Sequence, residues 1–242
     1  MNMPAASTFE LKRFYQISAI SMTIVVLLTL TDLVFGNVTG GFTSIPETAI
    51  GRFEEFEQSV IMGLYHLDLL NVFINTLSAI GFIGLFLAHS KERPVLTGFA
   101  TLIFIAGLIM FLSINTALPM MSIAEGFNES TDATHRAALV SAGETMIARG
   151  EHGSPSMFIS MFLMITAGIV MSWQMLKCSV FKPSVAIMVL ISYISLLAYI
   201  ILLAFFPETK NLAMIIVAPG GILGIIWQIL VTRKFFALGS IQ

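Results

Sequence analysis

Residues 95–118 read VLTGFATLIFIAGLIMFLSINTAL and contain no charged side chain. A helix needs about 20 mostly apolar residues to cross the ~30 Å hydrocarbon core of a bilayer. Five further runs of similar length and character lie along the chain, at 14–36, 60–88, 157–175, 185–205 and 212–231. The sequence therefore predicts a membrane protein with six spans.

The composition and the length of the runs together predict the fold class. The chain is 57% hydrophobic and 11% charged, whereas about a quarter of the residues in a soluble domain are charged. Lipid offers no hydrogen-bond partner, so each span must satisfy its own backbone groups within a helix. A membrane barrel would instead show ~10-residue segments of alternating polarity. We predict an all-α protein, a six-transmembrane-helix bundle that forms a single integral membrane domain over residues 1–242.

The basic residues fall unevenly between the spans. If the N-terminus is cytoplasmic, eight of the 12 Lys and Arg residues also lie on that side, namely Lys12, Arg13, Lys91, Arg93, Lys177, Lys182, Arg233 and Lys234. The other four lie on the outer side, namely Arg52, Arg136, Arg149 and Lys210. Short cytoplasmic connections carry an excess of Lys and Arg. This bias predicts a multi-pass protein with both termini in the cytoplasm. We expect it in a bacterial or archaeal cytoplasmic membrane.

The long outer loop at 119–155 contains the signals of a helix. Asp132 is a suitable N-terminal cap for a helix over 133–149, and Gly150 is a plausible stop. Its apolar residues, Leu139, Val140, Met146 and Ile147, share a face and are expected to turn toward the bundle or the lipid interface. This amphipathic helix is either a lid over the bundle or an ordinary loop helix packed on the spans.

Polar side chains gather in the outer half of the predicted bundle. Asp68, Asn71 and Asn75 share one face of the second span, while His66 points to a different neighbour. An ionisable side chain in a span costs about 2.5–3.5 kcal/mol, so these groups should face protein or water. We predict a polar pocket open to the outside, and its candidate residues are Asp32, His66, Asp68, Asn71, Asn75, Asn115, Glu144 and His152.

Three interpretations of this cluster remain open from the sequence. The polar groups serve as hydrogen bonds between helices, as a binding or proton-relay pocket, or as a metal or haem site. Zinc catalysis usually needs three closely placed His or carboxylate ligands, and no such spacing is present; only His66 lies well inside a predicted span. No catalytic residue, metal or cofactor is assigned. The single cysteine, Cys178, excludes an intrachain disulfide, and no basic patch with interleaved aromatics points to nucleic acid.

Three stretches resemble a bacterial family of six-span membrane proteins that is catalogued as a domain of unknown function, of the 4386 type. They are GLYHLDLLNVFINTLSAIGFIGLFL at 63–87, MLKCSVFKPSVAIMVLI at 175–191 and APGGILGIIWQILVTRKFF at 218–236. Asp68 matches an acidic position of that family, whereas His66 and the long acidic first loop depart from it. The resemblance implies the fold and the location but no activity.

These observations predict a non-enzymatic membrane component. Besides the lipid bilayer, it is expected to contact a small or lipidic ligand, a membrane protein partner or a second copy of itself, through the outward-facing polar pocket. One alternative is an intramembrane enzyme that uses Asp68 together with His66 or His152. The other is a proton-coupled transporter of small molecules.

Overall fold

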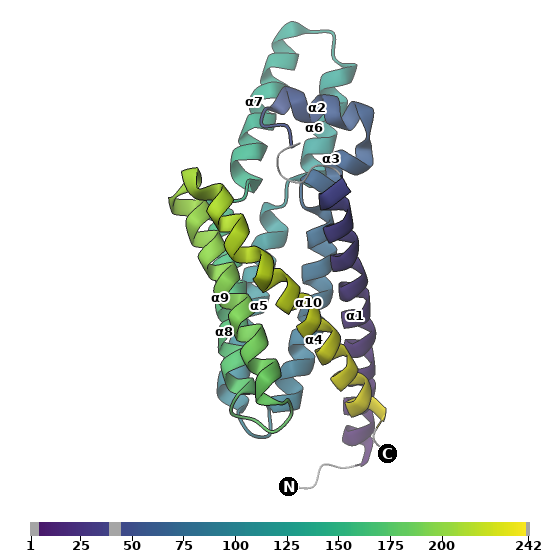
Figure 1. The fold of residues 1–242 in the computed structure, drawn as a ribbon. Coiled ribbons are helices and arrows are strands. Elements are labelled where there is room, and N and C mark those ends of the chain that lie inside the picture. The colour runs from purple at the N-terminus through teal and green to yellow at the C-terminus, as the bar shows by residue number, and fades with distance from the viewer. Residues whose placement is uncertain (1–4, 39–44, 241–242) are drawn as a thin grey trace.

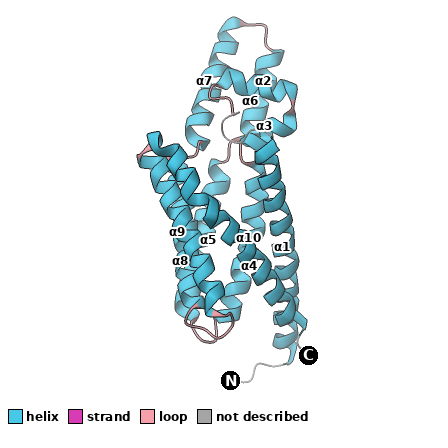
Figure 2. Cartoon of the chain, viewed as in Figure 1, coloured by secondary structure: helices cyan, strands magenta, loops and turns pink. Residues whose placement is uncertain are grey.

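The computed structural model describes residues 5–38 and 45–240, and nearly all of this part of the chain is helical (Figure 2). Six of the described helices are long and apolar enough to cross a membrane. Their bounds are α1 (Ala5–Val38), α4 (Leu69–His89), α5 (Pro94–Ile114), α8 (Pro155–Met175), α9 (Pro183–Phe205) and α10 (Lys210–Ser240). The all-α class and the six spans are therefore confirmed.

The six long helices pack around one apolar core. Aromatic and methionine side chains fill much of it, and the rings of Phe82 and Phe104 stack with centroids 4.3 Å apart. Helices α5 and α8 approach closely at Gly107, where a Cβ atom would lie 2.9 Å from the backbone oxygen of Ser160. Glycine is needed here because any side chain would force the two helices apart.

Four shorter helices form a second layer at one end of the bundle (Figure 1). They are α2 (Ala49–Gln58), α3 (Val60–His66), α6 (Ala117–Glu129) and α7 (Ala133–Gly150), and we call them the cap. The cap has an apolar core of its own, made of Ala49, Phe53, Phe56, Met120 and Ala124. Both ends of the described chain lie at the opposite end of the bundle, here called the termini end.

Helix α7 confirms the predicted loop helix, but its apolar face is turned differently. The Asp132 side chain accepts hydrogen bonds from the backbone of Thr134 and His135, as an N-terminal cap should. Val140, Met146 and Ile147 pack on the core of the cap, so the expectation that they face the bundle or the lipid is wrong. The reason is that α2 and α6, two helices that were not predicted, supply an apolar surface on which α7 packs.

Two of the predicted spans contain a break at the junction between bundle and cap. The predicted span 60–88 is divided at Leu67 and Asp68, and Asp68 adopts a left-handed backbone conformation with φ 62° and ψ 23°. The predicted span 95–118 is divided at Asn115, where α5 ends and α6 begins two residues later. The predicted start at 60 is wrong because the apolar run continues into the cap, whose core is apolar as well, whereas α5 ends within four residues of the predicted end at 118.

The Asn115 side chain ties the two breaks together. Its Nδ2 donates to the backbone oxygen of Leu67 at 3.0 Å, and its Oδ1 accepts from the backbone nitrogen of Ala117 at 3.1 Å. The amide thus satisfies backbone groups that the ended helices leave open. These hydrogen bonds hold the start of α4 next to the end of α5, directly below the cap.

Candidate functional site

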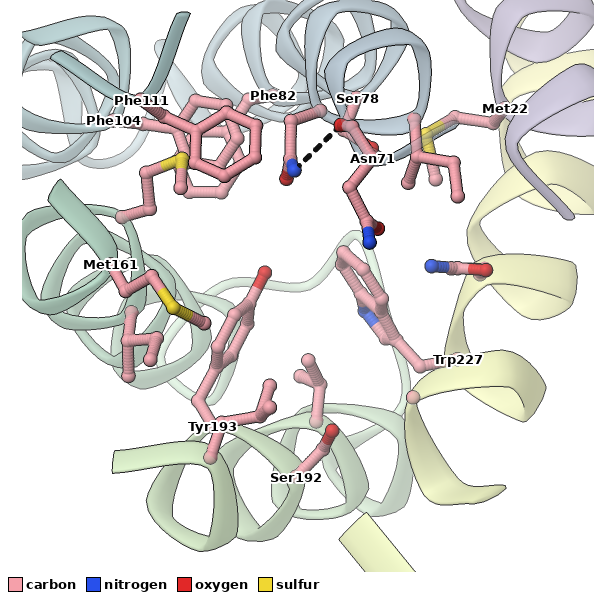
Figure 3. Close-up of a pocket in the computed structure, with 18 of the residues that line it drawn as sticks. Met22, Asn71, Ser78, Phe82, Phe104, Phe111, Met161, Ser192, Tyr193 and Trp227 are labelled. Atoms are coloured by element: carbon pink, nitrogen blue, oxygen red, sulfur yellow. Dashed lines mark hydrogen bonds between the residues drawn. The ribbon is translucent and has the colours of Figure 1, made fainter. Parts of the chain in front are cut away.

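A cavity of about 270 Å³ lies inside the bundle (Figure 3). Residues of α1, α4, α5, α8, α9 and α10 line it, together with His152 from the loop between α7 and α8. Ligand pockets in proteins commonly measure about 300–1,000 Å³, so the volume of this cavity lies just below that range. The cavity runs from the junction with the cap into the middle of the bundle.

Asp68 stands at the cap end of the cavity because the helix break places it there. It precedes the first residue of α4, where the partial positive charge of a helix start favours a carboxylate. Its Oδ1 accepts from Asn71 Nδ2 at 3.0 Å, and its Oδ2 lies 3.5 Å from His152 Nε2. A non-glycine residue in the left-handed region is strained, and such positions gather at functional sites.

Below Asp68, a polar stripe descends the face of α4 that borders the cavity. Asn71, Asn75 and Ser78 line the cavity with it, and Asn75 Nδ2 donates to the backbone oxygen of Asn71 at 2.8 Å. The stripe follows from spacings of three and four residues, which repeat on one helical face. In this part of the structure the amide and hydroxyl groups face open volume rather than another helix.

Helices α9 and α10 form the opposite wall. The hydroxyl group of Tyr193 points into the cavity, and its ring meets that of Trp227 edge to face with centroids 6.2 Å apart (Figure 3). Ser192 also lines the cavity, and its Oγ donates to the backbone oxygen of Gly220 at 2.7 Å. That contact is possible because Gly220 lets α10 come close to α9: a Cβ atom there would lie 2.6 Å from the Cβ of Ser195.

Two buried polar atoms on this wall have no hydrogen-bond partner among the described residues. They are Nε1 of Trp227, a residue that is 8% exposed, and Oε1 of Gln228, and both residues line the cavity. An unpaired buried donor or acceptor costs about 1–3 kcal/mol. Native proteins rarely leave such groups without protein, water or ligand partners. An unpaired donor and an unpaired acceptor at one cavity therefore indicate an occupant.

Neither Trp227 nor Tyr193 is among the pocket residues predicted from the sequence. Trp227 lies four residues before the predicted end of the sixth span, where tryptophan ordinarily marks the membrane surface. Helix α10 continues to Ser240, so the indole is inside the bundle instead. A polar residue directly after it, Gln228, was the available signal that this turn faces something other than lipid.

The eight predicted pocket residues divide into two groups. Asp68, Asn71, Asn75 and His152 line the cavity. Asn115 holds the junction, and the backbone oxygen of Asp32 accepts from the Tyr65 hydroxyl at 3.1 Å, which attaches α1 to the cap.

His66 and Glu144 belong to the cap and not to the cavity. His66 Nδ1 lies 2.5 Å from Glu55 Oε1. Glu144 Oε1 accepts from the backbone nitrogen of Ala49 at 2.8 Å and so caps the start of α2. Of the two loop residues expected near Asp68, His152 lies next to it and Glu144 does not. The histidine beside Asp68 is therefore His152 rather than His66.

The cap also encloses a cluster of charged residues. Arg52 is 7% exposed and lies 3.5 Å from Glu55, which also binds His66. Burial lowers the pKa of the Arg52 guanidinium and the charge of Glu55 opposes that shift. The ordinary pKa of arginine is so high that the group stays charged at neutral pH. Glu55 thus pairs with Arg52 within α2 and joins α2 to α3 through His66.

The part of the chain that the structure describes contains no group of three or more His, Cys, Asp and Glu residues placed to hold a metal ion. Comparison with known protein families, with curated proteins and with solved structures gives no match to the chain.

Proposed function

We propose that this protein is a multi-pass membrane protein that binds a small molecule in the cavity of its bundle, with access from the cap end. The observation that carries the proposal is the unpaired Trp227 indole and Gln228 amide oxygen at the cavity wall. Polar groups that only join helices find their partners in a neighbouring helix. Here Asn71 and Asn75 add further donors and acceptors to the same open volume. The binding site is thus part of the bundle itself.

The distribution of charge supports a proposed orientation in a cytoplasmic membrane. Eight of the 12 basic residues lie toward the termini end, in the first turns of α1, the connections at 90–93 and 176–182, and the last turns of α10. The cap carries most of the acidic loop residues. With an excess of Lys and Arg on the cytoplasmic side, the cap faces outward and the cavity is reached from outside. From the three stretches at 63–87, 175–191 and 218–236, we further propose that the chain belongs to the 4386-type family.

Cysteine labelling tests the orientation. Cys178 is buried, and burial raises the pKa of its thiol, so it is a poor probe. In a Cys178→Ser background, we expect an impermeant maleimide to label Thr131→Cys, in the exposed turn between α6 and α7, on intact cells. Ser179→Cys, exposed at the termini end, should be labelled only after the cells are opened. The reverse pattern would overturn the orientation.

Tryptophan fluorescence tests the binding site. The chain has two tryptophans, so Trp173→Phe leaves Trp227 as the reporter. In nanodiscs, we expect 2-phenylethanol to lower acrylamide quenching of Trp227 in a saturable manner, because the probe displaces water from the cavity. Ser78→Phe fills the cavity and should abolish saturation. Thr76→Phe adds the same ring two residues away on the exposed face of α4 and should leave it unchanged. The proposal would be refuted if 2-phenylethanol did not change the quenching of Trp227, or if Ser78→Phe and Thr76→Phe changed the response to 2-phenylethanol equally.

A further inference from the structure

We propose that the cavity selects an organic ammonium ion, whose charged nitrogen pairs with Asp68 and whose apolar body lies among the aromatic side chains below. This inference rests on the proposed function, since it names the class of ligand for the same cavity. It goes beyond that function because a neutral or anionic molecule would satisfy the unpaired Trp227 and Gln228 equally well.

The charges that line the cavity favour a cation. Among the described lining residues, none is Lys or Arg, and Asp68 is the only carboxylate. The nearest basic neighbour is His152, at 3.5 Å, while Asp32 of α1 adds a second acidic group within electrostatic reach. Arg52 also acts on Asp68 from a distance, but it is paired with Glu55 in the cap. An anion entering here would meet like charge without a fixed counter-ion.

Asp68 retains the capacity to bind a cation. A carboxylate offers about four lone-pair directions, and the recorded partners are one amide of Asn71 and the longer contact with His152. The side chain is 19% exposed, so it is mostly withdrawn from water. Charges attract one another more strongly in such surroundings than in bulk solvent. An ammonium at the cavity mouth can therefore take up the remaining oxygen lone pairs.

The walls below Asp68 suit the body of an organic cation. Phe82, Phe104 and Phe111 face Tyr193 and Trp227 across the cavity (Figure 3). Aromatic faces attract cations within about 6 Å and bury apolar groups equally well. From Asp68 to Ser78 the stripe on α4 covers ten residues, which is about 15 Å of helix. The site therefore has a charged mouth and a deep apolar body with neutral polar groups.

Three probes of similar size, which differ in charge, separate the contribution of the charge from that of the apolar body. They are 2-phenylethylamine, 2-phenylethanol and phenylacetate, titrated against the Trp173→Phe protein in nanodiscs of zwitterionic lipid, so that surface charge does not concentrate the amine. We expect the ammonium to bind at least about tenfold more tightly than the alcohol. Phenylacetate should give no saturable signal.

Asp68→Asn tests the assignment of the charge. Asparagine tolerates the left-handed conformation that this position requires. Asp68→Asn removes one partner of a charge pair that is largely shielded from water, so we expect binding of the ammonium to weaken by about 30-fold. Binding of the alcohol should change less than twofold. The control is Glu208→Gln, which removes an exposed carboxylate at the same end of the bundle and should change neither constant.

The outcomes distinguish the two proposals. If amine and alcohol bind alike, or if Asp68→Asn weakens both equally, the ammonium assignment fails and the binding cavity stands. If phenylacetate binds most tightly, the assignment also fails. If none of the three probes gives a saturable signal in a protein that retains its helical circular dichroism, both proposals fail.

Discussion

Glu55→Ala is expected to destabilise the cap by about 3–5 kcal/mol, the usual cost of removing one partner from a buried ion pair. Glu55 is the shared partner of Arg52 and His66, at 3.5 and 2.5 Å. Neither forms an ion pair with another carboxylate in the described chain, and Arg52 Nε and His66 Nε2 have no hydrogen-bond partner there. The variant therefore leaves a buried guanidinium without an ion-pair partner, and only the more distant carboxylates of Asp68 and Glu151 still act on its charge.

The effect should be local to the cap. Hydrogen exchange followed by mass spectrometry is expected to show faster exchange in α2 and α7, with α8 and α9 unchanged, because the bundle has its own core. Glu54→Ala is the matched control, since Glu54 is the exposed neighbour on the same helix and should change exchange little. Equal effects of the two substitutions would show that the buried pairing does not hold the cap.

Gly107→Ala should destabilise the bundle by about 3 kcal/mol, at the upper end of what one added methyl group costs in a packed core. The new Cβ would lie 2.8 Å from Cγ of Met164, 2.9 Å from the backbone oxygen of Ser160 and 3.0 Å from Cβ of Leu163. The methionine side chain can turn away. The backbone oxygen moves only if α8 moves, so the contact between α5 and α8 must open.

Gly221→Ala is the control for this substitution. A Cβ atom at Gly221 meets nothing within 4 Å, and alanine is favoured over glycine in a helix by about 1 kcal/mol. We expect thermal unfolding in the same detergent, followed by near-ultraviolet circular dichroism, to occur at a lower temperature for Gly107→Ala and at an unchanged or higher one for Gly221→Ala. If both variants unfold like the parent protein, α5 and α8 do not pack as closely as described.

The sequence alone was sufficient for features that depend on local solvent and spacing. The six spans follow from runs too long and too apolar to lie in water, and the helix at 133–150 follows from a cap residue and an apolar face. The shared face of Asp68, Asn71 and Asn75 follows from helical periodicity, and all three residues border the cavity. Each of these statements concerns residues within a few turns of one another.

Only the tertiary structure decided what the chain does at the junction and in the cavity. Hydropathy does not distinguish a side chain that faces lipid from one in the core of the cap, so Phe53 and Met120 gave no sign of a second layer. Pairings such as Glu55 with His66, and Asp68 with His152, join residues whose distance depends on where the helices cross and break. Tyrosine and tryptophan are common where helices pack together, so Tyr193 and Trp227 do not stand out in the sequence. They became site candidates because six helices leave a space beside them, and the absence of a neighbour cannot be inferred from any one segment of the sequence.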